Sequence, residues 1–346
     1  MVKISDFDYD LPAESIALKP PTKRGDSRLL VLDKASGDIT HDRYANLADF
    51  LNKGDTLILN DTKVIKARLI ANNTDGKLRE LLLLEDHHNT DFTTRKVLYR
   101  GKIRPNEILK VGKTEVVVRE VHDGGIATIS ANVNLLDLAE TAGSVPLPPY
   151  LHRDATAEDT ERYQTVFAKD PGSVAAPTAS LNFTHELEQR LRQKGVQIAY
   201  LTLHVGLGTF LPIRTDEIED HDMHSEYFEI PSETIEMIQK TKENSSRVVA
   251  LGTTVSRTLE FAAEKILSFD PKSNTKTISG EANIFIYPGY EFQLVDALLT
   301  NFHAPKSTVL MMAAAFAGWQ NLRNAYTEAI AHDYKLLSYG DSMLIL

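Results

Sequence analysis

DTLILNDTKVIKARLIA, residues 55–71, contains two kinds of strand within one short stretch. Its first half, TLIL (56–59), is uniformly apolar, as in a strand that is covered on both faces within an α/β sheet. Its second half, VIKARLIA (64–71), opens a series of short strands separated by turn residues. The polar NDTK (60–63) therefore marks the point where the chain leaves an α/β sheet and enters a separate β structure.

Short strands without a convincing helix follow one another from residue 63 to residue 131. The turns between them include Asn72-Asn73, Asp75-Gly76 and Asp123-Gly124-Gly125, and the last is a strong β-hairpin pattern. This spacing is typical of a small barrel or sandwich. The proline-rich GSVPLPPYLHRD (143–154) marks the exit from the segment.

Strands and helices alternate after this exit. We expect helices to begin at Thr184, Ser232, Val255 and Ser307. The expected strands are VQIAYLTLHV (196–205), RVVALG (247–252), FIYPGYEF (285–292) and LVDALLTNF (294–302). With the buried strand RLLVLD (28–33), the pattern predicts an α/β fold: a three-layer α/β/α main domain of residues 1–65 and 145–346, interrupted by a β-barrel domain of residues 66–144.

The composition excludes several classes of protein. The 346 residues include no cysteine, which excludes disulfides, thiolate metal sites and a cysteine nucleophile, and fits a reducing cytoplasm. No apolar run approaches the length that spans a membrane. The net charge of -10 argues against a protein that coats nucleic acid. We therefore expect a cytoplasmic protein without a membrane segment.

A local basic patch is compatible with this overall charge. Between Arg95 and Arg119, eight basic residues stand against two acidic ones. Such a segment can hold RNA phosphates, and it is also common on strands with exposed lysine-rich edges. Near the N-terminus, PPTKRGDSR (20–28) is suited to phosphate or carboxylate oxygens, or is a solvated loop.

Three strand ends continue into loops rich in glycine or threonine: HVGLGTF (204–210), GTTVSRTLE (252–260) and TNFHAPKST (300–308). Ligands collect at the carboxyl ends of strands in open α/β sheets, so these loops are predicted to share one pocket. Each loop alone also fits a tight turn. Because neither a Walker motif nor GxGxxG occurs, ordinary nucleotide binding is not supported.

VAAPTASLNFT (174–184) carries Thr178, Ser180, Asn182 and Thr184 at intervals of two residues. On an extended stretch, these side chains form either a substrate-binding wall or a capped loop. HDMHSEY (221–227) offers two histidines and a glutamate. We rank a metal site there below hydrogen-bonding histidines or plain loop residues, because histidine pairs of the HExxH type need a helix.

Taken together, these segments resemble the S-adenosylmethionine:tRNA ribosyltransferase-isomerase family of queuosine biosynthesis. The resemblance spans nearly the whole chain and is weakest in the β segment. The matching stretches, in the family's order, are FDYDLP, RLLVLD, GDTLILNDTKVIKARL, VPLPPY, ERYQTVFA, VAAPTASLNFT, LTLHVGLGTF, EDHDMHSEY, ALGTTVSRTLE, IFIYPGYEF, LLTNFHAPKST and YGDSML.

The resemblance implies a monomeric enzyme that needs no metal and uses S-adenosylmethionine as ribosyl donor. Its partner would be tRNA with a GUN anticodon, carrying 7-aminomethyl-7-deazaguanine at the wobble position. The product would be epoxyqueuosine in tRNA, with adenine and methionine released. The implied catalytic residues are His204, His221, His224, Glu226 and Asp341.

Two further sets of residues follow from the resemblance and the loops. The predicted substrate-binding residues are Asn60, Asp61, Thr62, Pro177, Thr178, Ser180, Asn182, Phe183, Gly206, Gly208, Thr209, Gly252, Thr253, Thr254, Arg257, Asn301 and His303. The predicted RNA-binding residues are Arg24, Arg28, Lys63, Arg68, Lys102 and Arg104.

One departure from the family pattern leaves alternatives open. Where the family commonly reads AAPTAGLHFT, this chain has Ser180 and Asn182, and an asparagine cannot act as an acid or base near neutral pH. The hypotheses are an active transferase, a paralogue that binds tRNA or S-adenosylmethionine without the full reaction, and, ranked last, a metal hydrolase that uses His221, His224 and Glu226.

Overall fold

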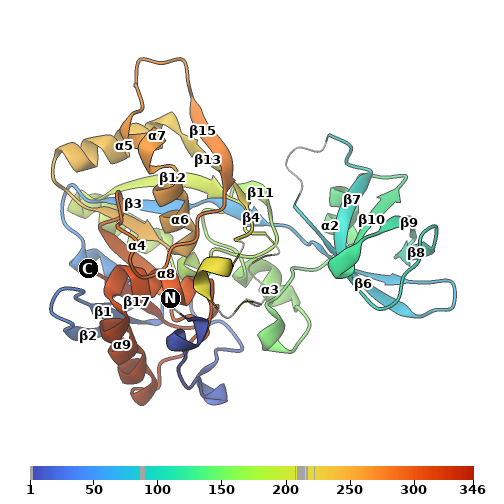
Figure 1. Ribbon diagram of the computed structural model, residues 1–346, viewed down its shortest axis with the longest axis horizontal. Helices are drawn as coiled ribbons and strands as arrows, with labels where there is room; N and C mark the ends of the chain where they lie inside the picture. The colour runs from blue at the N-terminus through green and yellow to red at the C-terminus, as the bar shows by residue number, and fades with distance from the viewer. Residues whose placement is uncertain (1–2, 86–89, 207, 209–214, 216, 222) are drawn as a thin grey trace.

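The computed structural model describes residues 3–85, 90–206, 208, 215, 217–221 and 223–346. These residues form a large mixed sheet with helices on both faces and a closed barrel that lies to one side of it (Figure 1). None of the helices in these ranges has the length and apolar character needed to cross a membrane.

Four neighbouring strands at the centre of the large sheet run parallel. Three of them, β3, β14 and β16, are buried along their whole length, as their apolar sequences require. The strand order is β15 (Thr277–Ala282), β13 (Glu226–Pro231), β12 (Gln197–Leu203), β3 (Thr56–Asn60), β14 (Val248–Leu251), β16 (Ala297–Asn301), β17 (Ser342–Ile345), β1 (Arg28–Leu32) and β2 (Ile39–Arg43).

Helices cover both faces of this sheet, which confirms the predicted three-layer α/β/α fold. Successive residues of a strand point to opposite faces, so Leu57 and Leu59 belong to one core and Ile58 to the other. The first core also contains α1 (Leu47–Phe50) and α4 (His185–Lys194). The second contains α5 (Ser232–Glu243), α6 (Thr253–Phe261), α7 (Ala263–Leu267), α8 (Thr308–Ala317) and α9 (Trp319–Ala331).

Polar caps start two of these helices as predicted. The hydroxyl of Thr184 accepts a hydrogen bond from the amide of Leu187 at 3.2 Å, and that of Ser307 accepts one from the amide of Leu310 at 3.3 Å. Such a cap typically contributes ~1 kcal/mol. Gly195, with a φ of 86°, ends α4 in the left-handed conformation.

Two of the predicted elements differ in the structure. The helix expected from Val255 onward bends at Ala262 into α6 and α7, although the amide of Ile266 still bonds to the carbonyl of Ala262. FIYPGYEF (285–292) is not a strand, and the strand nearby is β15. The carboxylate of Glu260 accepts hydrogen bonds from the backbone amides of residues 293–295, so these amides need no ladder partner.

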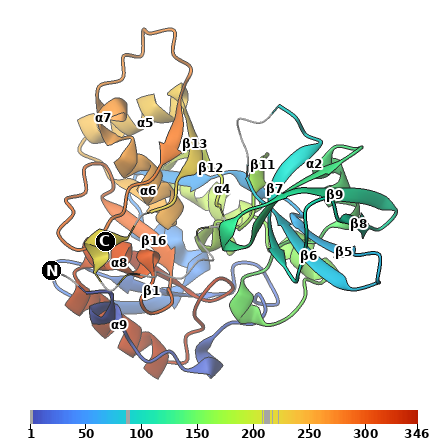
Figure 2. The ribbon, with the colours of Figure 1, turned by 45° about the vertical axis from the view of Figure 1, so that its right-hand side comes forward.

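The inserted segment forms a closed six-stranded barrel (Figure 2). This confirms the predicted β-barrel domain and excludes the β-sandwich alternative for this segment. The Asp123-Gly124-Gly125 turn joins two antiparallel strands, as the hairpin pattern predicts. The barrel is followed by α2 (Leu135–Ala142). Its strands are β5 (Arg68–Asn72), β6 (Leu78–Leu83), β7 (Thr94–Arg100), β8 (Ile108–Val111), β9 (Thr114–Val121) and β10 (Ile126–Ala131).

The chain enters and leaves the barrel through two paired segments. The backbones of Arg68 and Ser144 exchange two hydrogen bonds, of 3.1 and 2.9 Å. A small parallel sheet of β4 (Thr62–Val64) and β11 (Asp170–Ser173) lies beside this junction, and α3 (Ala157–Arg162) follows the proline-rich exit. The domain limits at residues 65/66 and 144/145 stay a prediction.

Candidate active site

Polar residues meet at one edge of the large sheet, because β12, β3 and β14 are parallel and end on the same side. Asn60, the last residue of β3, is fully buried. Its Nδ2 donates to the carbonyl of Leu203 at 3.0 Å, and its Oδ1 accepts from the amide of Leu203 at 3.1 Å. Nδ2 also lies 3.5 Å from Oγ1 of Thr254 in α6. Asn60 thus clamps two strand ends together beside a helix start.

His204 follows β12 and lines an open cleft of about 310 Å³. Its Nδ1 lies 2.8 Å from Oγ1 of Thr62, and its ring stacks on that of Tyr227 with centroids 6.3 Å apart. These contacts hold the imidazole in one orientation, which proton transfer requires. The rest of the lining includes Asp170 and Glu229, and two carboxylates make the cleft suitable for a cationic group.

Asp61 lies next to this cleft. One of its carboxylate oxygens accepts a hydrogen bond of 2.7 Å from the hydroxyl of Thr202, which lines the cleft. Burial raises the pKa of Asp61, and the hydrogen bond from Thr202 opposes that rise.

A second cluster of residues, two of them ionisable, surrounds Glu226, the first residue of β13. Its Oε1 accepts from the amide of Gly206 at 3.0 Å and lies 3.6 Å from Nε2 of His224, while its Oε2 forms an ion pair with Nη2 of Arg257. Burial, assisted by the charge of Arg257, lowers the pKa of His224 to about 4. His224 is therefore neutral at pH 7. The amide of His204 donates to the carbonyl of Tyr227 at 3.0 Å, which joins the two groups.

Glu85, at the end of the described run after β6 of the barrel, reaches the same group. A Cβ added to Gly206 would lie 1.8 Å from Oε1 of Glu85, so this carboxylate lies directly against the Gly206 backbone. Its charge acts to raise the pKa of both His224 and Arg257, although burial lowers each of them more. Sequence reasoning missed Glu85, because the only local pattern, LLLLED (81–86), is a strand end followed by two acids.

The VAAPTASLNFT stretch is not extended as we expected: residues Thr178–Ser180 form a 3-10 turn after Pro177. Hydrogen bonds from the amides of residues 180, 181 and 183 stabilise this turn in place of strand partners. Ser180 and Phe183 are fully buried, and the Ser180 hydroxyl has no hydrogen-bond partner among the described residues. Asn182 is also buried, and its Nδ2 donates to the carbonyl of Gly340 at 3.3 Å.

This turn connects to Asp341 through Asn301, the last residue of β16. The hydroxyl of Thr178 donates to Oδ1 of Asn301 at 2.8 Å, and Nδ2 of Asn301 lies 3.4 Å from the carbonyl of Asp341. The carboxylate of Asp341 accepts hydrogen bonds from the backbone amides of Arg28 at 2.6 Å and Lys335 at 2.8 Å. Burial raises the pKa of Asp341. Asp341 therefore holds two backbone segments beside the site.

The remaining predicted residues lie around these groups. Gly252, with a φ of 101°, directly precedes α6, and a Cβ on it would lie 3.7 Å from that of Ala179 in the 3-10 turn. Thr253 follows it as the first residue of α6. Nε2 of His303 bonds to the hydroxyl of Thr300 at 2.8 Å, and burial lowers the pKa of His303 to about 4.

The loop that contains the other predicted residues is described only in part. Gly208 approaches His224 so closely that a Cβ on it would lie 2.0 Å from the ring. His221 lies in a loop, as expected, and its ring packs edge-on against Phe285, with centroids 5.3 Å apart. Thr209 lies outside the described residues.

The six predicted RNA-binding residues fall into two classes. Lys63, Lys102 and Arg104 are exposed. Arg24 donates to the carbonyls of Gln164 and Leu181, and the Arg28 guanidinium lies 3.8 Å from the centroid of the Tyr334 ring. Arg24 and Arg28 thus already stabilise the fold.

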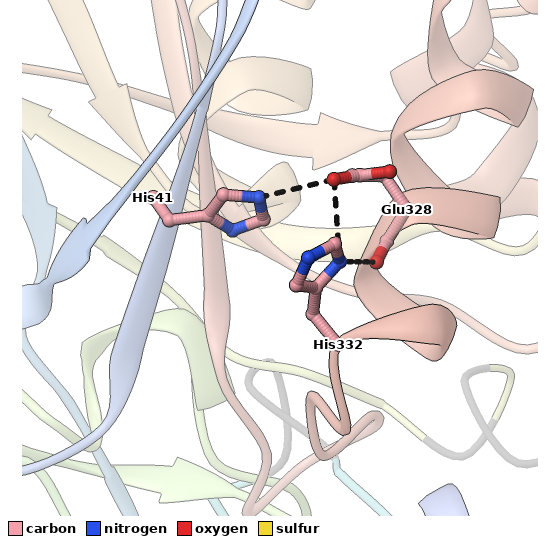
Figure 3. Close-up of side chains that lie close together, drawn as sticks. All are labelled: His41, Glu328 and His332. Atoms are coloured by element: carbon pink, nitrogen blue, oxygen red, sulfur yellow. Dashed lines mark hydrogen bonds and ion pairs between the residues drawn. The ribbon is translucent and has the colours of Figure 1, made fainter.

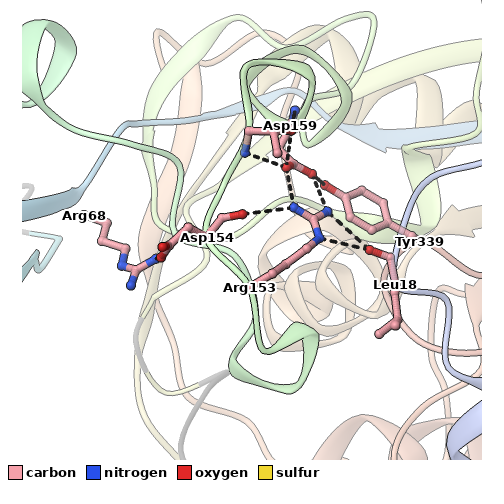
Figure 4. Close-up of polar contacts among 7 residues, drawn as sticks. Leu18, Arg68, Arg153, Asp154, Asp159 and Tyr339 are labelled. Carbon is pink, nitrogen blue, oxygen red and sulfur yellow. Dashed lines mark hydrogen bonds and ion pairs between the residues drawn. The ribbon is translucent and has the colours of Figure 1, made fainter.

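Arg68, the sixth of these residues, is part of a polar network at the barrel junction (Figure 4). It pairs with Asp154 at 2.9 Å, next to Arg153, whose guanidinium makes two hydrogen bonds of 2.6 and 2.8 Å to the buried carboxylate of Asp159. The Tyr339 hydroxyl donates to the same carboxylate at 2.7 Å. This network ties the barrel exit to the C-terminal segment that contains Asp341.

Comparison with known proteins identifies the family. A model of the family described as "Queuosine biosynthesis protein" matches residues 4–345. The "S-adenosylmethionine:tRNA ribosyltransferase-isomerase" of Chlorobaculum parvum is 54% identical over 345 residues, covering 99% of this chain and 100% of that relative. The protein of the same name from Halothermothrix orenii is 44% identical, with 100% of both chains covered.

A solved structure covers the same length. The crystal structure of S-adenosylmethionine tRNA ribosyltransferase from Thermotoga maritima has 34% sequence identity and a TM-score of 0.56, and the match covers 99% of this chain and 100% of that one. Since the family model and these relatives span the whole chain, the chain belongs to the queuosine biosynthesis protein family.

Proposed function

We propose that the chain is an S-adenosylmethionine:tRNA ribosyltransferase-isomerase. It transfers the ribosyl moiety of S-adenosylmethionine to 7-aminomethyl-7-deazaguanine at the wobble position of tRNA and isomerises it, which gives epoxyqueuosine and releases adenine and methionine. The observation that carries this proposal is the 54% identity, across the whole chain, to a protein of that name.

The cleft beside His204 suits the chemistry of a sulfonium substrate. The positive sulfur acidifies the ribose 5′ carbon, so a positioned base can remove a proton there and start the loss of adenine. His204 is our first candidate for this base, because Thr62 and Tyr227 orient its ring at the cleft. His224, neutral and next to Glu226, is the second.

The other predicted residues would hold the substrate. Gly252 leads into α6, whose first backbone amides, at Thr253 and Thr254, are offered to the methionine carboxylate. The buried hydroxyl of Ser180 is available for a substrate hydrogen bond. Asp170 and Glu229 would attract the sulfonium, while Asp61 would fix Thr202 in the wall of the cleft. Asp341 would act by holding the backbone segments of Arg28 and Lys335.

Lys63, Lys102 and Arg104 are the proposed phosphate contacts. They are exposed, and Lys102 and Arg104 belong to the barrel segment. The modified base must leave its stack to reach a cleft at the sheet edge, which single-stranded anticodon nucleotides do readily.

Several finer properties belong to the same proposal. The reaction uses no metal, because the sulfonium itself supplies the electrophile. We also propose a cytoplasmic monomer that acts on tRNAs with GUN anticodons. The absence of cysteine supports a reducing compartment. Sedimentation equilibrium, which measures the mass of the particle in solution, would test whether the chain is a monomer.

Adenine release tests the function directly. The purified chain should release adenine from S-adenosylmethionine when tRNA bearing the deazaguanine precursor is present. Substrate tRNA that lacks the aminomethyl group is the control and should give no release above background. Equal release with both tRNAs would contradict the proposed acceptor.

A further inference from the structure

Three metal-ligating side chains lie together away from the candidate active site, where α9 ends against the edge strand β2 (Figure 3). His41 belongs to β2, Glu328 lies in the last turn of α9, and His332 directly follows that helix, four residues after Glu328. One ligand atom from each lies within 4.8 Å of the other two. The spacing of Glu328 and His332 puts both on one face of the helix end.

The distances within this group match the coordination sphere of a small divalent ion. Oε1 of Glu328 lies 3.3 Å from Nε2 of His41 and 3.2 Å from Nδ1 of His332. Ligands of a tetrahedral zinc ion, at 2.0–2.1 Å from the metal, are roughly 3.3 Å apart. Two of the three ligand-to-ligand distances therefore already match those of a zinc site.

A neighbouring tyrosine prepares His41 to act as a ligand. Nδ1 of His41 lies 2.8 Å from the hydroxyl of Tyr334, which donates its single proton to the carbonyl of Leu29 at 3.3 Å. When a metal takes the lone pair of Nε2, the atom that faces Glu328, Nδ1–H of His41 can donate to this hydroxyl. Metal-bound histidines characteristically have such a partner on the second ring nitrogen.

The other two ligands and their surroundings define the rest of the site. Nδ1 of His332 lies 3.0 Å from the carbonyl of Glu328, so a metal would replace the proton shared there. The guanidinium of Arg28 lies over the Tyr334 ring and donates to the carbonyl of His332. Its positive charge opposes a cation, and the Glu328 carboxylate offsets it.

We propose that His41, Glu328 and His332 bind one Zn²⁺ ion. Two imidazoles and one carboxylate form a ligand set typical of zinc, with a fourth position open to water. The ion would join β2 to the end of α9 and so fix the start of the segment that runs from His332 to Asp341. It is a structural site, separate from the proposed reaction.

Zinc competition measures this site. The full chain, without a histidine tag and stripped with a chelator, is titrated with ZnCl₂ in competition with a chromogenic chelator. We expect one equivalent of Zn²⁺ per chain. At a free zinc concentration about 100 times the dissociation constant, Tm should rise by roughly 5 °C.

Variants assign the ion to these residues. His41→Ala and His332→Ala should each weaken zinc binding at least ~10-fold, and Tyr334→Phe, which keeps all three ligands, should weaken it ~10-fold by removing the hydrogen-bond partner of His41 Nδ1. His185→Ala is the matched control, because His185 also pairs with a glutamate on a helix, Glu188 at 3.8 Å. It should bind zinc as the parent does.

His332 is half-exposed at a helix end, so His332→Ala keeps the fold and gives a result even if another variant fails to fold. Less than a twofold change in this variant, or an equal loss in His185→Ala, would overturn the proposal. A negative zinc result would not contradict the proposed transferase activity, because His41, Glu328 and His332 do not belong to the proposed active site.

Discussion

The hydroxyl of Thr62, the first residue of β4, lies 2.8 Å from Nδ1 of His204 and so orients the imidazole at the end of β12. Thr62 belongs to NDTK (60–63), where the chain leaves the large sheet for the barrel. The same four residues therefore separate the two parts of the fold and build one wall of the cleft.

Replacing Thr62 tests whether this orientation supports catalysis. Thr62→Val keeps the shape and removes the hydrogen bond, so we expect kcat to fall ~10-fold with KM little changed, while His204→Ala should cost ~100-fold or more in kcat. Steady-state adenine release measures both. Thr327→Val, at an exposed residue whose hydroxyl donates to the carbonyl of Arg323 within α9, is the control. An unchanged kcat in His204→Ala would exclude His204 as the base.

Gly172 offers a steric test of the same imidazole. A Cβ on Gly172 would lie 2.7 Å from Cε1 and 2.9 Å from Nε2 of His204, so the ring must move in Gly172→Ala. We expect kcat to fall at least ~10-fold while tRNA affinity stays within twofold, because a small displacement of a catalytic group is costly. Equilibrium tRNA binding provides the comparison. Parental turnover would show that the position of His204 does not matter.

The parts of the fold that the sequence predicted follow from periodicity and capping. Apolar strands such as β3 and caps such as Thr184 are encoded by neighbouring residues, so they were predicted correctly. The 3-10 turn at 178–180 was not, since its hydrogen bonds depend on how Pro177 turns the chain. α9 was also missed, because the residues after Gly318 carry few of the patterns that mark a helix start.

In the candidate site, too, the residues marked by local sequence were predicted and those brought in by tertiary contacts were not. The strand-end loops predicted His204 and the resemblance added Asn60 and Thr62, and the parallel strands β12 and β3 bring these residues to one edge of the sheet. Glu85 reaches the site through tertiary packing of the barrel, and nothing local in its sequence marks it. Tyr227 ends the HDMHSEY stretch, but its stacking on His204 depends on the pairing of β12 with β13.

The network at Asp159 predicts how stability depends on pH. Burial raises the pKa of this carboxyl, but the hydrogen bonds from Arg153, the Thr156 amide and Tyr339 lower it further, to well below its ordinary value of 3.8. A depressed folded-state pKa adds stability above pH ~3.8 that is lost as pH falls through the folded value. The contribution of Asp159 to the free energy of unfolding should therefore be lost as the protein is acidified.

Asp159→Asn isolates this contribution. At pH 7 it should lower the free energy of unfolding by about 3 kcal/mol, because Arg153 loses its buried partner. The difference from the parent should shrink below pH 4. Urea denaturation at several pH values measures it, with the exposed Glu158→Gln as control, expected within ~0.5 kcal/mol. A difference that does not vary with pH would contradict the ion-pair explanation.

Charge reversal on the barrel tests the RNA surface. Lys102→Glu with Arg104→Glu should weaken tRNA binding and reduce the slope of log affinity against log salt by roughly 1.4, about 0.7 for each lost phosphate contact. Filter binding at several salt concentrations measures both quantities. Lys265→Glu, at an exposed lysine on α7, is the matched control. Equal weakening by Lys265→Glu would indicate a general charge effect and move the RNA surface elsewhere.

Transfer of isotope into tRNA tests the central claim most directly. The chain is incubated with S-adenosylmethionine labelled with ¹³C in its ribose and with tRNA carrying the aminomethyl deazaguanine, and the tRNA nucleosides are then analysed by mass spectrometry. We predict that all five labelled ribose carbons appear in an epoxyqueuosine nucleoside, which would also show that Ser180 and Asn182 permit the reaction. Bound S-adenosylmethionine and tRNA without label in the nucleoside would contradict the assignment as a ribosyltransferase-isomerase.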